Sequence, residues 1–178
     1  MNHQANDTFL ISIMGRDRVG VVSAVTNYLF ETGANLADSA YAVLGEGFEF
    51  SCVAEFSAGS SAEELENGLG ALEAIEGARI TVTRFPFELQ RRESGEITHV
   101  VEITGGDRPG LVSRMSDVLV AYGANIVRMS SRRVAAEGGF VYSTRFAVNV
   151  AGARLVALEN ALSNTAGSMR LECTVKTL

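Results

Sequence analysis

The sequence predicts an α+β chain of two tandem βαββαβ domains, each an antiparallel sheet with both helices on one face. Residues 11–23 align with residues 101–113 at an offset of 90 residues. The same offset, without a gap, places the Gly-Ala-Asn of residues 33–35 on that of residues 123–125. Two matching clusters in one register indicate an internal repeat, so each copy is expected to fold as one unit of the same kind.

The first half of each copy predicts a strand followed by a helix. Residues 9–14 and 98–104 are short runs, rich in Ile and Val, that end close to glycine. Helical spacing follows, and Gly33 and Gly123 suit the C-terminal ends of the two helices. The apolar stripe in the second copy comprises Leu111, Val112, Met115, Val118, Leu119 and Tyr122.

The middle of each copy predicts a hairpin with glycine-containing turns at residues 45–47 and 137–139. Phe50-Ser51 matches Tyr142-Ser143 after a two-residue slip, as expected if one hairpin changed length. The third strands alternate, and we assign one face of each to the core. These faces comprise Phe48, Phe50, Cys52, Ala54 and Phe56, and Phe140, Tyr142, Thr144, Phe146 and Val148.

A second helix and a last strand complete each copy. Ser61 and Glu64 open the first of these helices with a capping box. The apolar stripes are Leu65, Leu69, Leu72 and Ile75 in the first copy, and Leu155, Leu158 and Leu162 in the second. Residues 79–85 and 169–177 are the last strands. The resulting order of elements is the ferredoxin-like one, with both helices covering one face of a four-stranded antiparallel sheet.

The domain boundaries follow from a polar segment, residues 88–96, which we interpret as a linker. The first domain is then residues 8–87 and the second residues 97–178. We expect the two domains to pack side by side.

Composition and charge exclude several classes of function. The net charge is −6 and no long basic stripe occurs, which argues against direct nucleic-acid binding. No apolar run reaches membrane-spanning length, and the N-terminus lacks an apolar signal core. Cys52 and Cys173 lie in apolar, strand-like runs, so we expect buried, reduced thiols and a cytoplasmic protein.

Catalytic residues cannot be assembled from the sequence. His3 lies in the N-terminal tail and His99 begins a strand, so no Ser–His–Asp set, metal-ligand spacing or cofactor motif is found. We therefore expect no catalytic residue, metal or cofactor, and a protein that is not an enzyme.

Two alternatives use the same topology. An acylphosphatase-like enzyme would hold phosphate with Arg16 or Arg18 and Asn35, although Asp17 and Asp107 would repel the anion. A single-stranded RNA-binding module would need aromatic side chains on the open face of the sheet, whereas those of the third strands are assigned to the core.

A strand that ends in Asp-Arg-Pro-Gly at residues 107–110, then a helix, then Gly-Ala-Asn resembles the ACT domain. The first copy departs from this pattern, with Val19 in place of proline. Two such domains without a catalytic domain resemble the glycine cleavage system transcriptional repressor family.

The resemblance implies a regulator that senses a small amino acid, glycine or similar. It also implies action on transcription through a protein partner such as a transcription factor. A role as an allosteric regulatory subunit of a metabolic enzyme, and homodimerisation, remain open.

The expected ligand sites lie at the starts of the first helices, where unpaired N–H groups suit a carboxylate. The aspartates could bind the ammonium group and the asparagines either end. These residues also have purely structural interpretations. The aspartates could be N-caps, the asparagines could be turn residues, and the glycines could allow close packing of helix and strand. The candidate residues are Asp17, Arg18, Gly20, Val21 and Asn35, and Asp107, Arg108, Pro109, Gly110, Leu111 and Asn125.

The family resemblance further implies that each site combines the loop of one copy with the second strand of the other. That would pair Asp17 with Asn125 and Asp107 with Asn35. Because it keeps the full Asp-Arg-Pro-Gly pattern, the second copy is expected to depend more strongly on its aspartate.

Overall fold

The computed structural model of the chain divides into two compact units, with the division between Leu89 and Gln90. His3, and Arg91 of the expected linker, lie outside the residues that the structure describes. The described residues are 7–90, 92–106, 108–137 and 139–178. Each unit is treated below as a separate domain.

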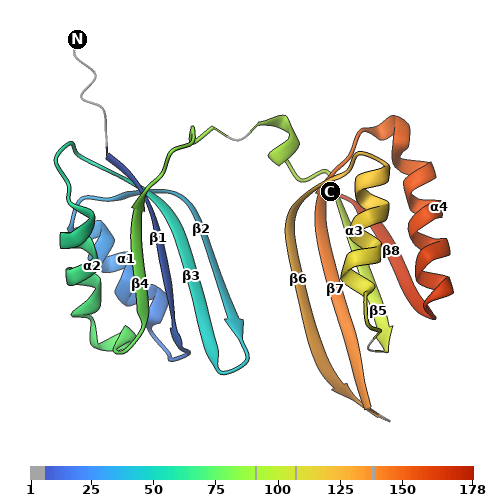
Figure 1. Cartoon of the computed structure of the whole chain (residues 1–178), viewed down its shortest axis with the longest axis horizontal. Coiled ribbons are helices and arrows are strands. Elements are labelled where there is room, and N and C mark those ends of the chain that lie inside the picture. The colour runs from blue at the N-terminus through green and yellow to red at the C-terminus, as the bar shows by residue number, and fades with distance from the viewer. Residues whose placement is uncertain (1–6, 91, 107, 138) are drawn as a thin grey trace. The chain divides into compact units, whose positions relative to one another are not determined.

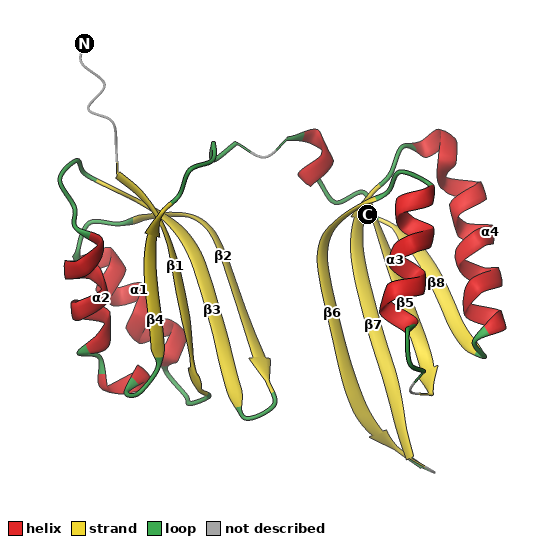
Figure 2. Cartoon of the chain, viewed as in Figure 1, coloured by secondary structure: helices red, strands yellow, loops and turns green. Residues whose placement is uncertain are grey.

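The first domain is a four-stranded antiparallel sheet with the strand order β2-β3-β1-β4. Its elements are β1 (Asp7–Arg16), α1 (Val21–Glu31), β2 (Asn35–Leu44), β3 (Gly47–Phe56), α2 (Ala62–Gly70), the short 3₁₀ helix η1 (Glu73–Ile75) and β4 (Arg79–Arg84). Both α-helices cover one face of the sheet, as Figure 1 and Figure 2 show.

The second domain repeats this topology, with the strand order β6-β7-β5-β8. Its elements are the 3₁₀ helix η2 (Glu93–Gly95), β5 (His99–Gly106), α3 (Leu111–Ala121), β6 (Asn125–Ala136), β7 (Gly139–Asn149), α4 (Gly152–Ser168) and β8 (Leu171–Thr177). The expectation of two tandem ferredoxin-like domains is therefore confirmed.

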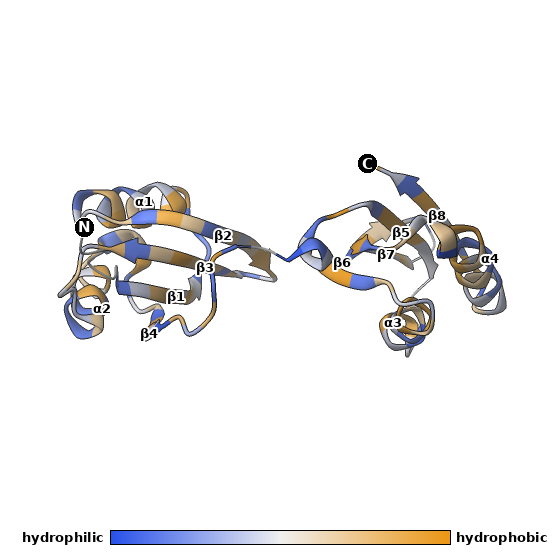
Figure 3. Ribbon diagram, turned by 90° about the horizontal axis from the view of Figure 1, so that it is seen from above, coloured by the Kyte–Doolittle hydropathy of each residue, from blue (hydrophilic) through white to orange (hydrophobic). Residues whose placement is uncertain are grey.

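The strands build the cores by alternation. Along β1, Phe9, Ile11 and Ile13 are fully buried while the residues between them are half-buried. Figure 3 shows hydrophobic and hydrophilic residues in bands along the strands. The helices add Val21, Val25 and Leu29 in the first domain, and Leu111, Met115 and Leu119 take the equivalent places in the second. One apolar cluster per domain thus lies between sheet and helices.

The first helix of each domain ends as the sequence predicts. Gly33 and Gly123 adopt positive φ angles of 84° and 70° directly after the last helical turn. The N–H of the following alanine bonds the carbonyl oxygen of Leu29 or Leu119 at 2.9 Å. Together with the glycine N–H bonds to Phe30 and Val120, this is the Schellman arrangement, which favours glycine at that position.

The helix predicted to carry Leu65, Leu69, Leu72 and Ile75 is shorter than expected. Ser61 caps it by accepting a bond from the N–H of Glu64, but α2 ends at Gly70. Two glycines in its last three residues weaken the helix, and the chain continues into η1. Ile75 is still buried, because the 3₁₀ turn carries it back to the same core.

The hairpin of the second domain is longer than that of the first, and the slip between the copies is therefore four residues rather than two. Gly15 pairs with Phe48, whereas Gly105 pairs with Tyr142. The expected slip of two residues and the observed slip of four are both even numbers. The third strands therefore present the expected residues to the core. Phe140 is the exception: it lies beyond the end of β5 and is 51% exposed, with the Arg133 guanidinium 4.0 Å from its ring centre.

Candidate functional site

The helices α1 and α3 each begin after a glycine whose backbone conformation favours that residue. Gly20 and Gly110 have φ angles of 96° and 82° and act as the N-caps. A Cβ atom on either would meet no described atom within 4 Å, so packing does not explain them. The interpretation of Asp17 as an N-cap is therefore wrong. No described side chain caps either helix. In α3 the Leu111 N–H donates to the Arg108 carbonyl at 3.1 Å, and the next N–H groups of the first turn have no side-chain cap among the described residues.

In the first domain, Asp17 is held by hydrogen bonds to the hairpin of β2 and β3. The hydroxyl of Tyr41 on β2 donates to Asp17 Oδ1 at 2.7 Å, and the Asp17 N–H donates to the Glu46 carbonyl at 3.0 Å. The Tyr41 ring stacks on Phe48, with 5.8 Å between the ring centres. The hydrogen bond to Asp17 raises the pKa of Tyr41. The tyrosine thus lies over the loop that was expected to bind a ligand.

In the second domain, Ser131 takes the place of Tyr41 on the corresponding strand. Its hydroxyl shares a 2.8 Å hydrogen bond with that of Thr144, across to β7. Tyr142 corresponds to Phe48. Without a large side chain above it, Tyr142 lines a pocket of about 250 Å³ at the start of α3. The other lining residues are Arg108, Pro109, Gly110, Leu111, Val112 and Ser113.

The expected asparagines lie at the other end of each sheet. Asn35 pairs with Glu55 at the beginning of β2 and donates to its carboxylate at 3.2 Å, while Arg16 at the end of β1 pairs with Gly47. Asp17 follows Arg16, so one domain does not bring Asp17 and Asn35 together. The arginine and asparagine of the acylphosphatase alternative are likewise not assembled within the first domain.

Asn125 forms a hydrogen bond with the segment that precedes β5. Its Nδ2 donates to the Ser94 carbonyl at 2.6 Å. Asn149 Nδ2 adds bonds to the carbonyls of Glu93 and Glu96 at 3.0 and 2.9 Å. Part of the polar segment expected to be a linker is thus held against β6 and β7. Asp107 lies outside the described residues.

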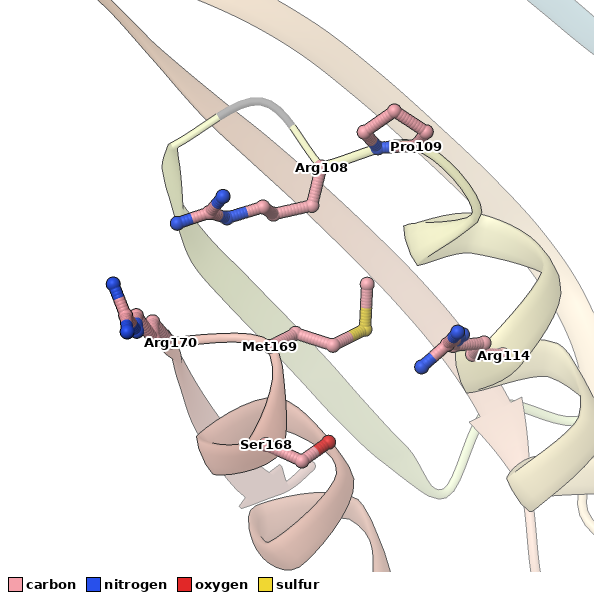
Figure 4. Close-up of a pocket in the computed structure, with 6 residues that line it drawn as sticks. All are labelled: Arg108, Pro109, Arg114, Ser168, Met169 and Arg170. Carbon is pink, nitrogen blue, oxygen red and sulfur yellow. The ribbon is translucent and has the colours of Figure 1, made fainter.

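A second, larger pocket of about 440 Å³ opens beside the first in the same domain. It is lined by Arg108, Pro109, Arg114, Ser168, Met169 and Arg170, which Figure 4 shows. Sequence reasoning missed Arg114 and Arg170, as it did Tyr41 and Ser131. The repeat offset could have found Tyr41 and Ser131, because it pairs a large residue with a small one in otherwise matching strands.

Other candidate chemistry is sparse in the described part of the chain. No three His, Cys, Asp or Glu residues there are grouped to hold a metal ion. His99 is buried, with its Nδ1 2.9 Å from the Thr98 hydroxyl. Burial raises the pKa of the Cys52 thiol to about 12, which disfavours the reactive thiolate. None of the described helices has the length and apolar character needed to cross a bilayer.

Comparison with known proteins supports the fold and the repeat. The chain is 28% identical over 128 residues to the glycine cleavage system transcriptional repressor of Escherichia coli (strain K12). That alignment covers 72% of this chain and 66% of the relative, and the Shigella flexneri protein of the same name matches equally well. The aligned region thus spans slightly less than two thirds of these relatives.

Solved structures share the arrangement over nearly the whole chain. A protein of unknown function from Galdieria sulphuraria superposes with a TM-score of 0.76 at 22% identity, covering 98% of this chain and 99% of that one. A protein provisionally named a glycine cleavage system transcriptional repressor gives 0.64 at 14% identity, covering 97% and 98%. These likenesses show the fold.

The family to which the chain belongs is shown by its amino-acid sequence. The pattern that defines the ACT domain matches twice, over residues 7–83 and 98–176. Those two segments contain all four α-helices described above and both sheets, except for the last residue of β4 and of β8. The chain belongs to the ACT domain family, with two copies of the domain in tandem, and its sequence is similar to that of the glycine cleavage system transcriptional repressor.

Proposed function

We propose that this protein is a non-enzymatic regulator that binds a small amino acid, glycine or a similar one, and modulates transcription of amino-acid metabolism genes through a protein partner. The observation that carries the proposal is the pocket at the start of α3. The relationship to a transcriptional repressor of the glycine cleavage system supports it.

The pocket matches the chemistry of a free amino acid. The first turn of α3 offers backbone N–H groups and a partial positive charge to a carboxylate. Pro109 donates no N–H of its own, and Gly110 leaves the approach to the backbone open. A volume of about 250 Å³ suits a ligand of a few heavy atoms. We assign the ammonium group to the carboxylate of Asp107.

The first domain is the weaker site in this proposal. Its loop carboxylate already accepts the Tyr41 hydroxyl, and the ring occupies the space above Phe48. A ligand there would have to displace a hydrogen bond and a stacked ring. We therefore propose that the second domain gives the main response to the amino acid.

Transferring the tyrosine into the second domain tests the proposal. Ser131→Tyr should fill the space above Tyr142, as Tyr41 does above Phe48, and abolish binding of glycine. Isothermal titration calorimetry with glycine and the other small amino acids measures this directly. Because a ligand that binds only the native state raises apparent stability, thermal shifts should disappear in parallel.

Ser130→Tyr is the matched control. Ser130 is exposed and comes directly before Ser131 on β6, so it lies on the opposite face of the sheet from Ser131. It should bind as the unchanged protein does. Equal affinity in Ser131→Tyr and the unchanged protein would overturn the placement of the ligand. The proposed route through a protein partner fails if the chain itself binds duplex DNA in a saturable, salt-dependent way, which a net charge of −6 disfavours.

A further inference from the structure

Three arginines surround the larger pocket of the second domain. Arg108 comes from the loop after β5, Arg114 from the first turns of α3, and Arg170 from the turn between α4 and β8. In Figure 4 their side chains are arranged around Met169. Met169 is buried and forms the floor, whereas the arginines are exposed. The described residues that line the pocket include no carboxylate.

These positive charges are not balanced within the described structure. The ion pairs found between described residues involve Arg16, Arg84, Arg145 and Lys176, and none of the pocket arginines. Guanidinium groups gathered around one cavity repel one another, so an anion bound between them would relieve that repulsion. The three clustered positive charges contrast with the net charge of −6 of the whole chain.

The backbone at Arg170 adds a further cost. Arg170 has a φ of 59° and is the one described residue other than glycine with a positive φ. The first domain has Gly77, with a φ of 75°, at the equivalent turn before its last strand. Glycine adopts this conformation without strain, whereas arginine does not. The second domain therefore carries an arginine where the local structure favours glycine.

The first domain also has no arginine equivalent to Arg114. Ala24 stands at the position of Arg114, so only Arg18 corresponds to an arginine of the pocket. The same fold thus forms without two of the three charges, and folding does not require them.

We propose that this pocket binds a small polyanion with at least two phosphate or carboxylate groups. Guanidinium groups bind both kinds of oxyanion through paired, charge-assisted hydrogen bonds. About 440 Å³ accommodates a compact metabolite. The site is separate from the amino-acid pocket, which Tyr142 and residues 110–113 line, although Arg108 and Pro109 border both.

Calorimetry on the full chain tests the proposal with pyrophosphate and citrate as separate probes. We expect saturable 1:1 binding of at least one of them, and the stronger of the two identifies the oxyanion class. Arg114→Ala and Arg170→Gly, which install the first domain's residues, should each weaken binding roughly tenfold or more. Arg170→Gly should at the same time leave the melting temperature unchanged or raise it, which separates loss of binding from loss of folding.

Arg79→Ala is the matched control, because Arg79 is an exposed arginine that begins the last strand of the first domain. It should leave binding unchanged. The proposal is overturned if neither probe binds, if the Arg114→Ala, Arg170→Gly double variant binds as well as the unchanged protein, or if Arg79→Ala weakens binding equally. Displacement of the probe by a DNA oligonucleotide, with tighter binding of longer oligonucleotides, would also overturn it, since the site would then serve an extended polymer.

Discussion

The two domains of this protein share one topology and differ at the rim of the sheet beside their first helices. In the first domain, Tyr41 lies over the loop and holds the Asp17 carboxylate. In the second, Ser131 leaves a pocket, and Arg114 and Arg170 line another where the first domain has Ala24 and Gly77. The buried residues of α1 and α3 and the glycines at both ends of these two helices, by contrast, match position by position.

This contrast separates what the fold needs from what a site needs. Leu29 and Leu119, and likewise Gly20 and Gly110, are shared by both copies and serve the packing and the backbone of either domain. Arg114 and Arg170 differ between the copies, and the fold forms without them in the first domain. Duplication inside a single chain thus provides a reference structure for each domain.

The largest expected effect tests whether the cores are equivalent. Leu29 and Leu119 are each 0% exposed, and Leu→Ala at either should lower the free energy of unfolding of its own domain by about 2–5 kcal/mol. Chemical denaturation followed by amide hydrogen exchange in each domain measures both changes. The next residues, Phe30 and Val120, are 79% and 71% exposed, so their alanine variants are controls that should cost less than about 0.5 kcal/mol. A large effect in one domain and none in the other would break the equivalence.

The helix N-caps should give a smaller and equal effect in the two domains. Gly20→Ala and Gly110→Ala should each cost about 1–2 kcal/mol, because alanine is strained at a positive φ. No described atom lies near the added Cβ, so the cost should be conformational alone. Asparagine, which tolerates this conformation better, should cost less than alanine at both positions. Urea midpoints at constant m-value provide the measurement, and an alanine variant without any cost would argue against the left-handed caps.

The smallest expected effect is the pKa shift of Tyr41, which tests how the loop of the first domain differs from that of the second. The hydrogen bond to Asp17 raises the pKa of Tyr41 above its ordinary value of 10.0. The folded state therefore holds the proton more tightly than the unfolded state. The corresponding stabilisation is present below pH 10 and is lost as the pH rises through the folded pKa.

Ultraviolet titration of tyrosinate measures this shift. Asp17→Asn should lower the pKa of Tyr41. Because burial also raises the pKa of Tyr28, Tyr41→Phe should remove one of two late-titrating tyrosines. Glu49→Gln, an exposed carboxylate change on β3, is the control and should leave the titration as it is. A Tyr41 titration that is unchanged in Asp17→Asn would show that the loop of the first domain is not held as described.

The sequence by itself determined the repeat, the order of elements and most of the core. Alternation in β1 and β3, the stripes of α1 and α3 and the glycines after them are local patterns with a direct structural meaning. The Asp-Arg-Pro-Gly and Gly-Ala-Asn motifs were sufficient to suggest the ACT domain, and the family match confirms that suggestion.

Only the tertiary structure decided which side chains meet at the loops. Tyr41 and Asp17 are 24 residues apart, and Arg170 joins Arg108 and Arg114 from the far end of the domain. Such meetings depend on strand register and on the length of the hairpin, where the alignment of the copies was two residues in error. Local periodicity specifies which face a residue takes, because it repeats along one element. The distance between residues on different elements is set by the packing of the whole domain.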